Sequence, residues 1–440
     1  MKIGFVSLGC SKNLVDTEVM LKRLADAGYT ITPDETEADI IVVNTCGFIQ
    51  SAKEEAIDNI LDVAWLKKNR SLKGIIATGC LVERYREQVL EEMPEVDAAL
   101  GTGSYHKIVE AVEAVARGEK YASFEDKNEA PLGGERIVTT PPYTAYLKVA
   151  EGCDNRCTYC AIPLIRGRMR SRRIEDVVAE AKSLEKIGVK ELNIIAQDTS
   201  RYGLDLYGKY MLPELVQKIL AETQIPWIRL LYLYPDKITD ELVAVIRDND
   251  RVCKYVDLPI QHVSDTVLAR MNRHGDGAVV RAAVEKIRRE IPGVTLRTTA
   301  IVGFPGETEA QFAELCEFVK ETGFDRFGAF TYSPEEGTPA AEFPDQIDEQ
   351  VKQDRYDTLM AVQLEVSEKK MQEKIGDVIE VLCEGYDPVA GVQYGRSRAD
   401  APDVDGKVYF TSAKKLPEGV FVNVKITKAL DYDLFGEAVR

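Results

Sequence analysis

The chain has 440 residues, of which 45% are hydrophobic and 29% are charged, and its formal net charge is −17. This length allows two to four domains, and the lack of a low-complexity tract or of an apolar run long enough to cross a bilayer excludes fibrous and membrane-spanning proteins. The acidic balance disfavours non-specific binding to nucleic acid and favours a basic partner.

The N-terminal segment Met1–Leu8 is typical of a first β-strand, because its apolar stretch is too short for a signal peptide. We therefore expect a cytoplasmic protein, whose thiols stay reduced. Nine cysteines in such a chain favour metal ligation over disulfide bonds.

Residues 1–117 alternate strand-like and helix-like patterns. The strand-like runs lie at 2–8, 39–43 and 73–78, and the helical runs lie at 13–27, 51–68, 83–92 and 105–116. This repeat predicts a small, mostly parallel sheet with flanking helices, which forms an N-terminal α/β domain over residues 1–117.

Three cysteines follow the three strands of this domain. Cys10, Cys46 and Cys80 each lie two or three residues past a different strand, in Gly-flanked loops. Because such loops emerge at one edge of a parallel sheet, we expect the three thiols to converge. One interpretation is three unrelated buried cysteines. The other is a three-cysteine [4Fe–4S] cluster with one open iron, a place where sulfur could be held.

The periodicity is lost over residues 118–142, which predicts a linker. From residue 143 it resumes, with strand-like runs at 144–149, 190–196, 227–233, 254–259, 294–302 and 326–332, separated by helical runs. Six such units predict a central open (βα)6 barrel over residues 143–370, with its chemistry at the carboxyl ends of the strands.

The first strand of this barrel leads into a C-x3-C-x2-C run formed by Cys153, Cys157 and Cys160. Three thiolates can hold three irons of a [4Fe–4S] cube, and no further cysteine precedes Cys253, so one iron would stay open. The alternative is a structural zinc site, which usually has four ligands in paired knuckles.

The C-x3-C-x2-C run resembles the signature of the radical S-adenosylmethionine (SAM) superfamily, including the aromatic Tyr159 before the last cysteine. The resemblance implies reductive cleavage of SAM at the open iron and a deoxyadenosyl radical that abstracts hydrogen from an unactivated C–H bond. By analogy, polar groups at other strand ends would hold SAM, and we expect these to include Gln197, Asp198, Gln261 and Gly303.

Basic residues crowd the segment after the C-x3-C-x2-C run, namely Arg166, Arg168, Arg170, Arg172 and Arg173. They form either a solvated loop or a means to neutralise the SAM carboxylate or an acidic substrate group, since guanidinium matches carboxylate in a bidentate fork. The three histidines show no catalytic partner in the sequence: His106, His262 and His274. The remaining cysteines are expected to be structural: Cys253, Cys316 and Cys383.

The C-terminal part begins with a charged, helix-periodic connector at 345–374. Short alternating strands then predict a small five-stranded antiparallel β-barrel of OB-like character over residues 372–440. This segment holds nine Lys/Arg and twelve Asp/Glu, a net charge of −3, whereas a module that binds phosphates should be basic.

The order of these three domains is similar to that of the methylthiotransferase family, over essentially the whole chain, and the last barrel resembles the TRAM domain that serves substrate docking there. Three motifs resemble the branch that methylthiolates the β-carbon of an aspartate in protein twelve of the small ribosomal subunit: Ser7–Asn13, Gln197–Gly203 and Gly395–Pro402. A basic ribosomal protein also suits the acidic barrel, so nucleic acid is disfavoured as the substrate. The alternative in the same family is a tRNA adenosine 2-methylthiotransferase.

The resemblance implies two [4Fe–4S] clusters, with one SAM methylating sulfur held at the Cys10/Cys46/Cys80 cluster. A second SAM would be reduced at the Cys153/Cys157/Cys160 cluster, and the aspartate β-carbon, after loss of hydrogen, would capture the methylthio group. A reductant such as flavodoxin or ferredoxin and a sulfur donor are also implied. Two other classes remain as alternatives: an iron–sulfur electron-transfer protein, which would not need the barrel, and a zinc-stabilised RNA-binding module, which would explain only the C-terminal barrel.

Overall fold

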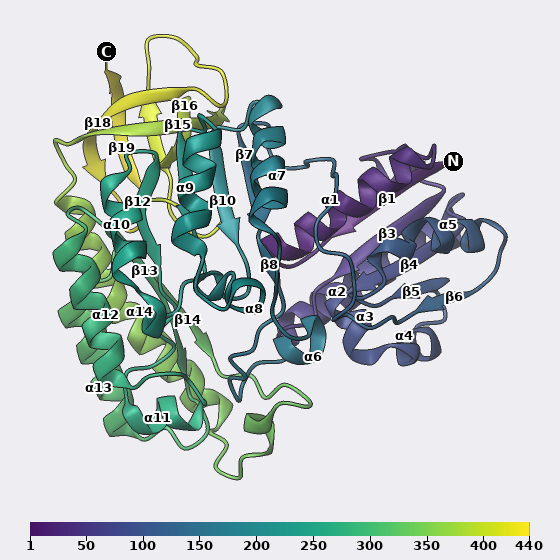
Figure 1. The fold of residues 1–440 in the computed structure, drawn as a ribbon, viewed down its shortest axis with the longest axis horizontal. Coiled ribbons are helices and arrows are strands. Elements are labelled where there is room, and N and C mark those ends of the chain that lie inside the picture. Colours follow the sequence, from purple (N-terminus) through teal and green to yellow (C-terminus); the bar gives the residue numbers. More distant parts are fainter. Residues whose placement is uncertain (440) are drawn as a thin grey trace.

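The N-terminal domain is built on a six-stranded parallel sheet with the order β2-β1-β3-β4-β5-β6. The computed structural model describes residues 1–439 (Figure 1). The strands are β1 (Lys2–Ser7), β2 (Thr30–Ile31), β3 (Ile40–Thr45), β4 (Gly74–Gly79), β5 (Ala98–Leu100) and β6 (Tyr121–Ser123). The central strands β3 and β4 are buried throughout, as expected for continuous apolar runs covered on both faces.

Helices cover both faces of this sheet. On one face, α1 (Ser11–Asp26) and α5 (Ile108–Ala116) pack against β1, β3 and β4. On the other face lie α2 (Gln50–Asn69), α3 (Cys80–Tyr85) and α4 (Glu87–Glu92). Successive residues of β3 alternate between the two cores, with Val42 in the first and Val43 in the second, because side chains of a strand point to opposite faces in turn.

The central domain is an open barrel of six parallel strands in the order β14-β13-β12-β11-β10-β7, in which β7 and β14 form the two edges. The strands are β7 (Thr144–Lys148), β10 (Glu191–Ile195), β11 (Trp227–Leu230), β12 (Val252–Asp257), β13 (Thr295–Val302) and β14 (Arg326–Thr331). The predicted (βα)6 barrel is thereby confirmed. The covering helices are α7 (Ile174–Lys186), α9 (Leu212–Glu222), α10 (Asp240–Asp248), α12 (Gly277–Glu290) and α13 (Glu309–Thr322).

The last domain is a closed five-stranded barrel that α14 (Glu349–Gln372) joins to the central domain. Its strands are β15 (Val378–Asp387), β16 (Val392–Ser397), β17 (Val408–Thr411), β18 (Phe421–Ala429) and β19 (Leu434–Val439). The prediction of a small barrel is confirmed, with one correction: β17 and β19 pair in parallel, and the other pairs are antiparallel. The parallel pair closes the barrel between two strands that are not connected by a hairpin.

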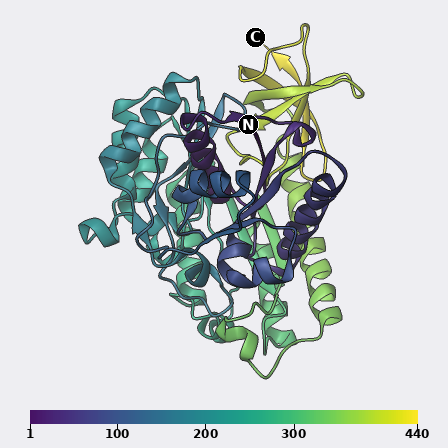
Figure 2. The same cartoon turned by 90° about the vertical axis from the view of Figure 1, so that its right-hand side faces the viewer.

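The C-terminal barrel packs against the amino ends of the central strands. Arg396 pairs with Glu191, the first residue of β10, and the ring of Phe421 lies 4.9 Å from that of Trp227, the first residue of β11. In Figure 2 the N-terminal domain lies in front of the central barrel and the C-terminal barrel lies above it. Both smaller domains also contribute to one apolar cluster of the central domain, with Val15 from α1 and Leu382 from the C-terminal barrel.

Short elements depart from the expected pattern where polar contacts decide the backbone. Arg86, with φ +45°, divides the helix expected at 83–92 into α3 and α4. The segment predicted as a linker contributes β6 to the first sheet. Other small elements that periodicity did not show are β2 and β5 of the first sheet, and β8 (Ala150–Glu151), β9 (Arg170–Ser171), α6 (Ile162–Arg166), α8 (Leu204–Tyr207) and α11 (Asp265–Arg270). Among residues 1–439, no helix is both long and apolar enough to cross a membrane.

Candidate active site

Cys153, Cys157 and Cys160 lie on the loop between β8 and α6, at the carboxyl end of the first barrel strand. Burial raises the pKa of Cys153 to about 12, and neighbouring Asp198 and Cys157 add to the shift. Burial also raises the pKa of Cys160, with further contributions from Cys157 and Cys153. The three thiols therefore lie on one short loop and influence one another electrostatically.

The loop is held by contacts from the segment that follows β10. Asn155 donates its side-chain amide to Asp198 at 2.7 Å and accepts from Arg201 at 2.8 Å. Gly152 has φ +80°, and a Cβ there would lie 2.1 Å from the carbonyl oxygen of Arg168. The sequence therefore needs glycine at this position, because any other residue would clash with backbone in a conformation that L-residues rarely adopt.

Cys10, Cys46 and Cys80 come from three separate loops that the sheet edge brings together. Cys10 precedes α1, Cys46 follows β3, and Cys80 begins α3. A Cβ on Gly9 would lie 2.9 Å from the Cys46 sulfur, and a Cβ on Gly47 would lie 2.9 Å from the carbonyl carbon of Cys80. Burial raises the pKa of Cys80 to about 12, and the thiols of Cys10 and Cys46 raise it further.

The two cysteine sets are neighbours, joined through α6. Cys80 packs with Ala161 and Ile165 in one small apolar cluster, and Ala161 directly follows Cys160 in the chain. The hydroxyl of Thr102 also donates to the carbonyl oxygen of Ile165 at 2.6 Å. The helix after the C-x3-C-x2-C run therefore forms one wall of the N-terminal site.

The donor chemistry of both sets suits iron–sulfur clusters better than a single ion. Within residues 1–439, no three His, Cys, Asp or Glu side chains lie close enough together to hold one metal ion. A [4Fe–4S] cube binds each thiolate through a different iron, which requires a wider spacing than one ion does. Three thiolates are the usual protein ligands of an iron–sulfur cluster that keeps one iron open, so the donor chemistry of each set fits such a cluster.

The chain is similar to known proteins over its whole length. Residues 2–101 match the family described as uncharacterized protein family UPF0004, residues 147–319 the radical SAM superfamily, and residues 375–439 the TRAM domain. The ribosomal protein uS12 methylthiotransferases RimO of Desulforamulus reducens and Geobacter sulfurreducens are each 51% identical to it, covering 100% of this chain and 99% and 98% of theirs. The chain belongs to the RimO family.

A solved structure supports the same fold. The radical SAM methyltransferase TsrM of Kitasatospora setae, with cobalamin and a [4Fe–4S] cluster bound, has a TM-score of 0.56 at 14% identity, over 77% of this chain and 73% of that chain. Membership of the RimO family makes this chain a methylthiotransferase of the radical SAM superfamily, which implies a [4Fe–4S] cluster and SAM.

The residues predicted to hold SAM fall into two groups. Gln197 and Asp198 lie beside the C-x3-C-x2-C loop, where burial raises the pKa of Asp198. Gln197 donates to Glu151 at 2.6 Å, and its carbonyl oxygen is buried without a hydrogen-bond partner. Gln261 has φ +69° and pairs its backbone with β13. Gly303 directly follows β13, and a Cβ there would lie 2.3 Å from the side chain of Lys352.

Tyr159 belongs to a group of aromatic and basic side chains that sequence reasoning did not assemble. Arg273 donates to the Tyr159 hydroxyl at 3.3 Å and stacks 4.0 Å from the ring centre of Tyr234. The Tyr234 hydroxyl in turn lies 3.3 Å from the Cys157 sulfur. The non-glycine residues with positive φ at this end of the barrel include Arg156 and Tyr232, and such strained backbone is typical of functional sites.

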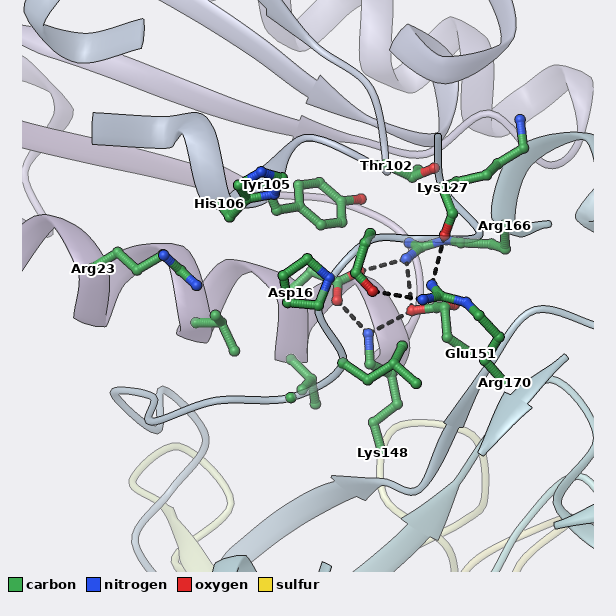
Figure 3. A pocket seen from close by; sticks show the side chains of 17 residues that line it. Asp16, Arg23, Thr102, Tyr105, His106, Lys127, Lys148, Glu151, Arg166 and Arg170 are labelled. Carbon is green, nitrogen blue, oxygen red and sulfur yellow. Dashed lines mark hydrogen bonds and ion pairs between the residues drawn. The ribbon is translucent and has the colours of Figure 1, made fainter. Parts of the chain in front are cut away.

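A buried charge network joins the RimO-family N-terminal domain to the barrel (Figure 3). Asp16 of α1 pairs with both Lys148 and Arg166, and Glu151 pairs with the same two cations. Arg166 also donates to Asn13 at 3.0 Å and to the Cys80 sulfur at 3.4 Å. The network lines a cavity of about 50 Å³ between α1, the segment at 127–133 and β8.

The arginine-rich segment is divided between buried and exposed side chains, so the interpretation as a solvated loop holds for only part of it. Arg166 and Arg172 are buried, Arg170 donates to backbone carbonyl groups at 127 and 130, and Arg168 and Arg173 are exposed. The buried His262 bonds to Glu307 at 3.0 Å, a structural contact. His106 pairs with Glu125, and His274 is exposed. Cys253 and Cys383 are fully buried, and Cys316 is partly so.

Proposed function

We propose that this chain methylthiolates the β-carbon of an aspartate in ribosomal protein uS12. Relatives with about half of their residues identical are named ribosomal protein uS12 methylthiotransferases, and the aspartate β-carbon is what the family resemblance implies. The observation that carries the proposal is the shared wall of the two cysteine sites, where Cys80 packs against Ala161. A reaction that joins sulfur from one site to a carbon activated at the other requires such proximity.

We propose two cluster sites, held by Cys153, Cys157 and Cys160 and by Cys10, Cys46 and Cys80. When bound, the first supplies the electron that cleaves SAM and the second holds the sulfur that is transferred. The chain's own residues orient and enclose these groups: Asn155 fixes the first loop and Arg166 braces Cys80.

SAM would lie against the carboxyl ends of the strands. The free carbonyl oxygen of Gln197 is placed to accept a hydrogen bond from an ammonium or hydroxyl donor, and Glu151 orients that amide by accepting from its nitrogen. Tyr159, Asp198, Gln261 and Gly303 complete the proposed SAM-lining set. Asp198 is 1% exposed and is held by Asn155 and Ser200, so it positions the cysteine loop from behind.

The partners beyond uS12 follow from the chemistry. We propose a reductant of the flavodoxin or ferredoxin type, a separate sulfur donor, and action in the cytoplasm. The division of the chain into residues 1–117, 118–142, 143–370 and 372–440 stays a prediction, which limited proteolysis would examine. The tRNA adenosine activity remains the alternative within the family, although the acidic TRAM segment disfavours it.

Mass spectrometry of the reconstituted enzyme, incubated separately with uS12 and with tRNA, tests the assignment. We expect a methylthio adduct on uS12; an adduct on tRNA alone would overturn the substrate and leave the chemistry in place. Cys157→Ala should abolish SAM cleavage, whereas Cys46→Ala should retain cleavage and lose sulfur insertion. Sulfur insertion by Cys46→Ala would refute the role of the second site.

A further inference from the structure

One face of α2 is apolar and exposed. The helix packs onto the sheet through Ala56, Ile60 and Val63. Beside this buried face, Ile57, Leu61 and Trp65 are 39%, 48% and 57% exposed, and their spacing of four residues aligns them in a single stripe. The apolar arc of α2 is therefore wider than the part that the sheet covers, as in a helix that packs against a second surface.

Acidic side chains run along the same exposed face. Glu54, Asp58 and Asp62 are all exposed and repeat with the same four-residue spacing. On an α-helix they form a stripe parallel to the apolar one. The combined surface, which we call the α2 face, presents large apolar side chains beside a row of negative charge.

The α2 face starts close to the cysteine sites. The helix begins at Gln50, a few residues after Cys46. Its buried Lys53 pairs at 3.1 Å with Glu335, on the segment that follows the carboxyl end of β14. The TRAM domain lies at the amino ends of the barrel strands instead. The start of α2 therefore lies beside the carboxyl ends of the barrel strands, the end at which the cysteine loop also lies.

We propose that the α2 face is a docking surface for uS12, an inference that rests on the proposed function. A protein that binds ribosomal RNA must carry an excess of Lys and Arg to neutralise phosphates, and those side chains complement the acidic row. The apolar stripe, with Trp65 at its most exposed position, supplies the anchor that a specific interface needs. The negative charges of the acidic row repel the phosphates of RNA.

Trp65 provides a direct reporter. The chain has two tryptophans, and the other, Trp227, is fully buried beneath the C-terminal barrel. Titration of the intact enzyme with uS12 should shift the fluorescence emission to the blue, and the shift should vanish in Trp65→Phe. Titration with tRNA should leave the emission unchanged.

Charge reversal measures the contribution of the acidic row. The double variant Asp58→Lys with Asp62→Lys should raise KM for uS12 at least tenfold. The matched control is Glu317→Lys with Glu321→Lys, which makes the same charge change at the same spacing on exposed positions of α13. The control should leave KM within twofold of the wild type.

The outcomes separate this proposal from the enzyme's activity. Methylthiolation of uS12 without a Trp65 shift, and with normal KM in the double variant, would overturn the docking surface alone. A blue shift that depends only on enzyme concentration would assign the face to a second copy of this chain and overturn the proposal. Binding of uS12 at Trp65 without an adduct would leave docking intact and refute the proposed function.

Discussion

Replacement of Arg166 probes the contact between the two cysteine sites. The Arg166 side chain is 3% exposed and reaches Asp16, Glu151, Asn13 and the sulfur of Cys80. Arg166→Met removes the charge and keeps a long apolar stem. Arg166→Lys keeps the charge and loses the planar fork that reaches several partners at once. The pair of variants therefore separates charge from geometry.

The structure gives the expected loss of stability and the expected change in reduction potential when the Arg166 charge is removed. Asp16, Glu151, Lys148 and Arg166 together are neutral, and loss of the guanidinium leaves one buried negative charge uncompensated, at a cost of about 3–5 kcal/mol. The N···S separation to Cys80 is 3.4 Å, where two unit charges interact by about 5 kcal/mol at an effective dielectric constant of 20. Because a cluster spreads its charge over several atoms, we expect roughly half of this interaction energy. Loss of the Arg166 charge should therefore lower the reduction potential of a cluster at Cys80 by ~100 mV.

The assay is a redox titration followed by electron paramagnetic resonance, in a chain whose Cys153, Cys157 and Cys160 are replaced by Ala. Arg166→Met should titrate at a more negative potential, and Arg166→Lys should lie closer to the wild type. Hydrogen exchange on the metal-free chain should quicken in α1 and α6 for the Met variant. Unchanged potential together with faster exchange would refute the electrostatic argument and leave Arg166 a structural role only.

Three further perturbations address stability and iron incorporation. Burial would raise the pKa of Glu191, but two buried arginines lower it to about 2. The charged form therefore stabilises the fold above pH 4.5, and this contribution of about 3 kcal/mol is lost as the pH falls from 4.5 to 2. Glu191→Gln should unfold at a lower urea concentration than the wild type at pH 7, and the difference should shrink in acid. Glu335→Gln leaves two buried cations unpaired and should speed hydrogen exchange around it by an amount equivalent to about 3–5 kcal/mol, unlike the exposed Glu336→Gln. Gly152→Ala should prevent iron incorporation, measured by absorbance. The control is Gly188→Ala, which is also at positive φ but has no atom within 4 Å of the added Cβ, and it should lower the free energy of unfolding by only about 1 kcal/mol.

The sequence predicted the elements of the fold that produce a regular pattern of apolar residues along the chain. The strands of both sheets are continuous apolar runs such as Ile40–Val43, because a parallel sheet covered by helices buries both faces. The loops that carry Cys10, Cys46 and Cys80 leave these strands at one edge, so their convergence followed from topology. Periodicity and handedness were sufficient for this level of detail.

No regular pattern in the sequence predicted the polar contacts between the domains. Asp16 and Arg166 are far apart in sequence and meet only because α1 packs beside β7. Charged residues are usually exposed, so burial of Arg166 and Glu151 is a property of the tertiary structure. One clue was present: several arginines close after the cysteine run are more than a solvated turn requires. The placement of the TRAM domain depended likewise on Arg396 and Glu191, which no pattern connects.

The position of α6 constrains how sulfur can reach the substrate. Ala161 follows Cys160 covalently and packs on Cys80 with Ile165, so the separation between the two sites is set by one peptide segment and one apolar contact. Opening this interface would expose the apolar cluster and would also separate Asp16 from Arg166, at a cost of several kcal/mol for each buried ion left alone. The proposed transfer would therefore take place in a closed arrangement of the two domains. A substrate bound at the proposed docking surface would approach past the start of α2, where Lys53 pairs with Glu335, and the α2 face would guide this approach.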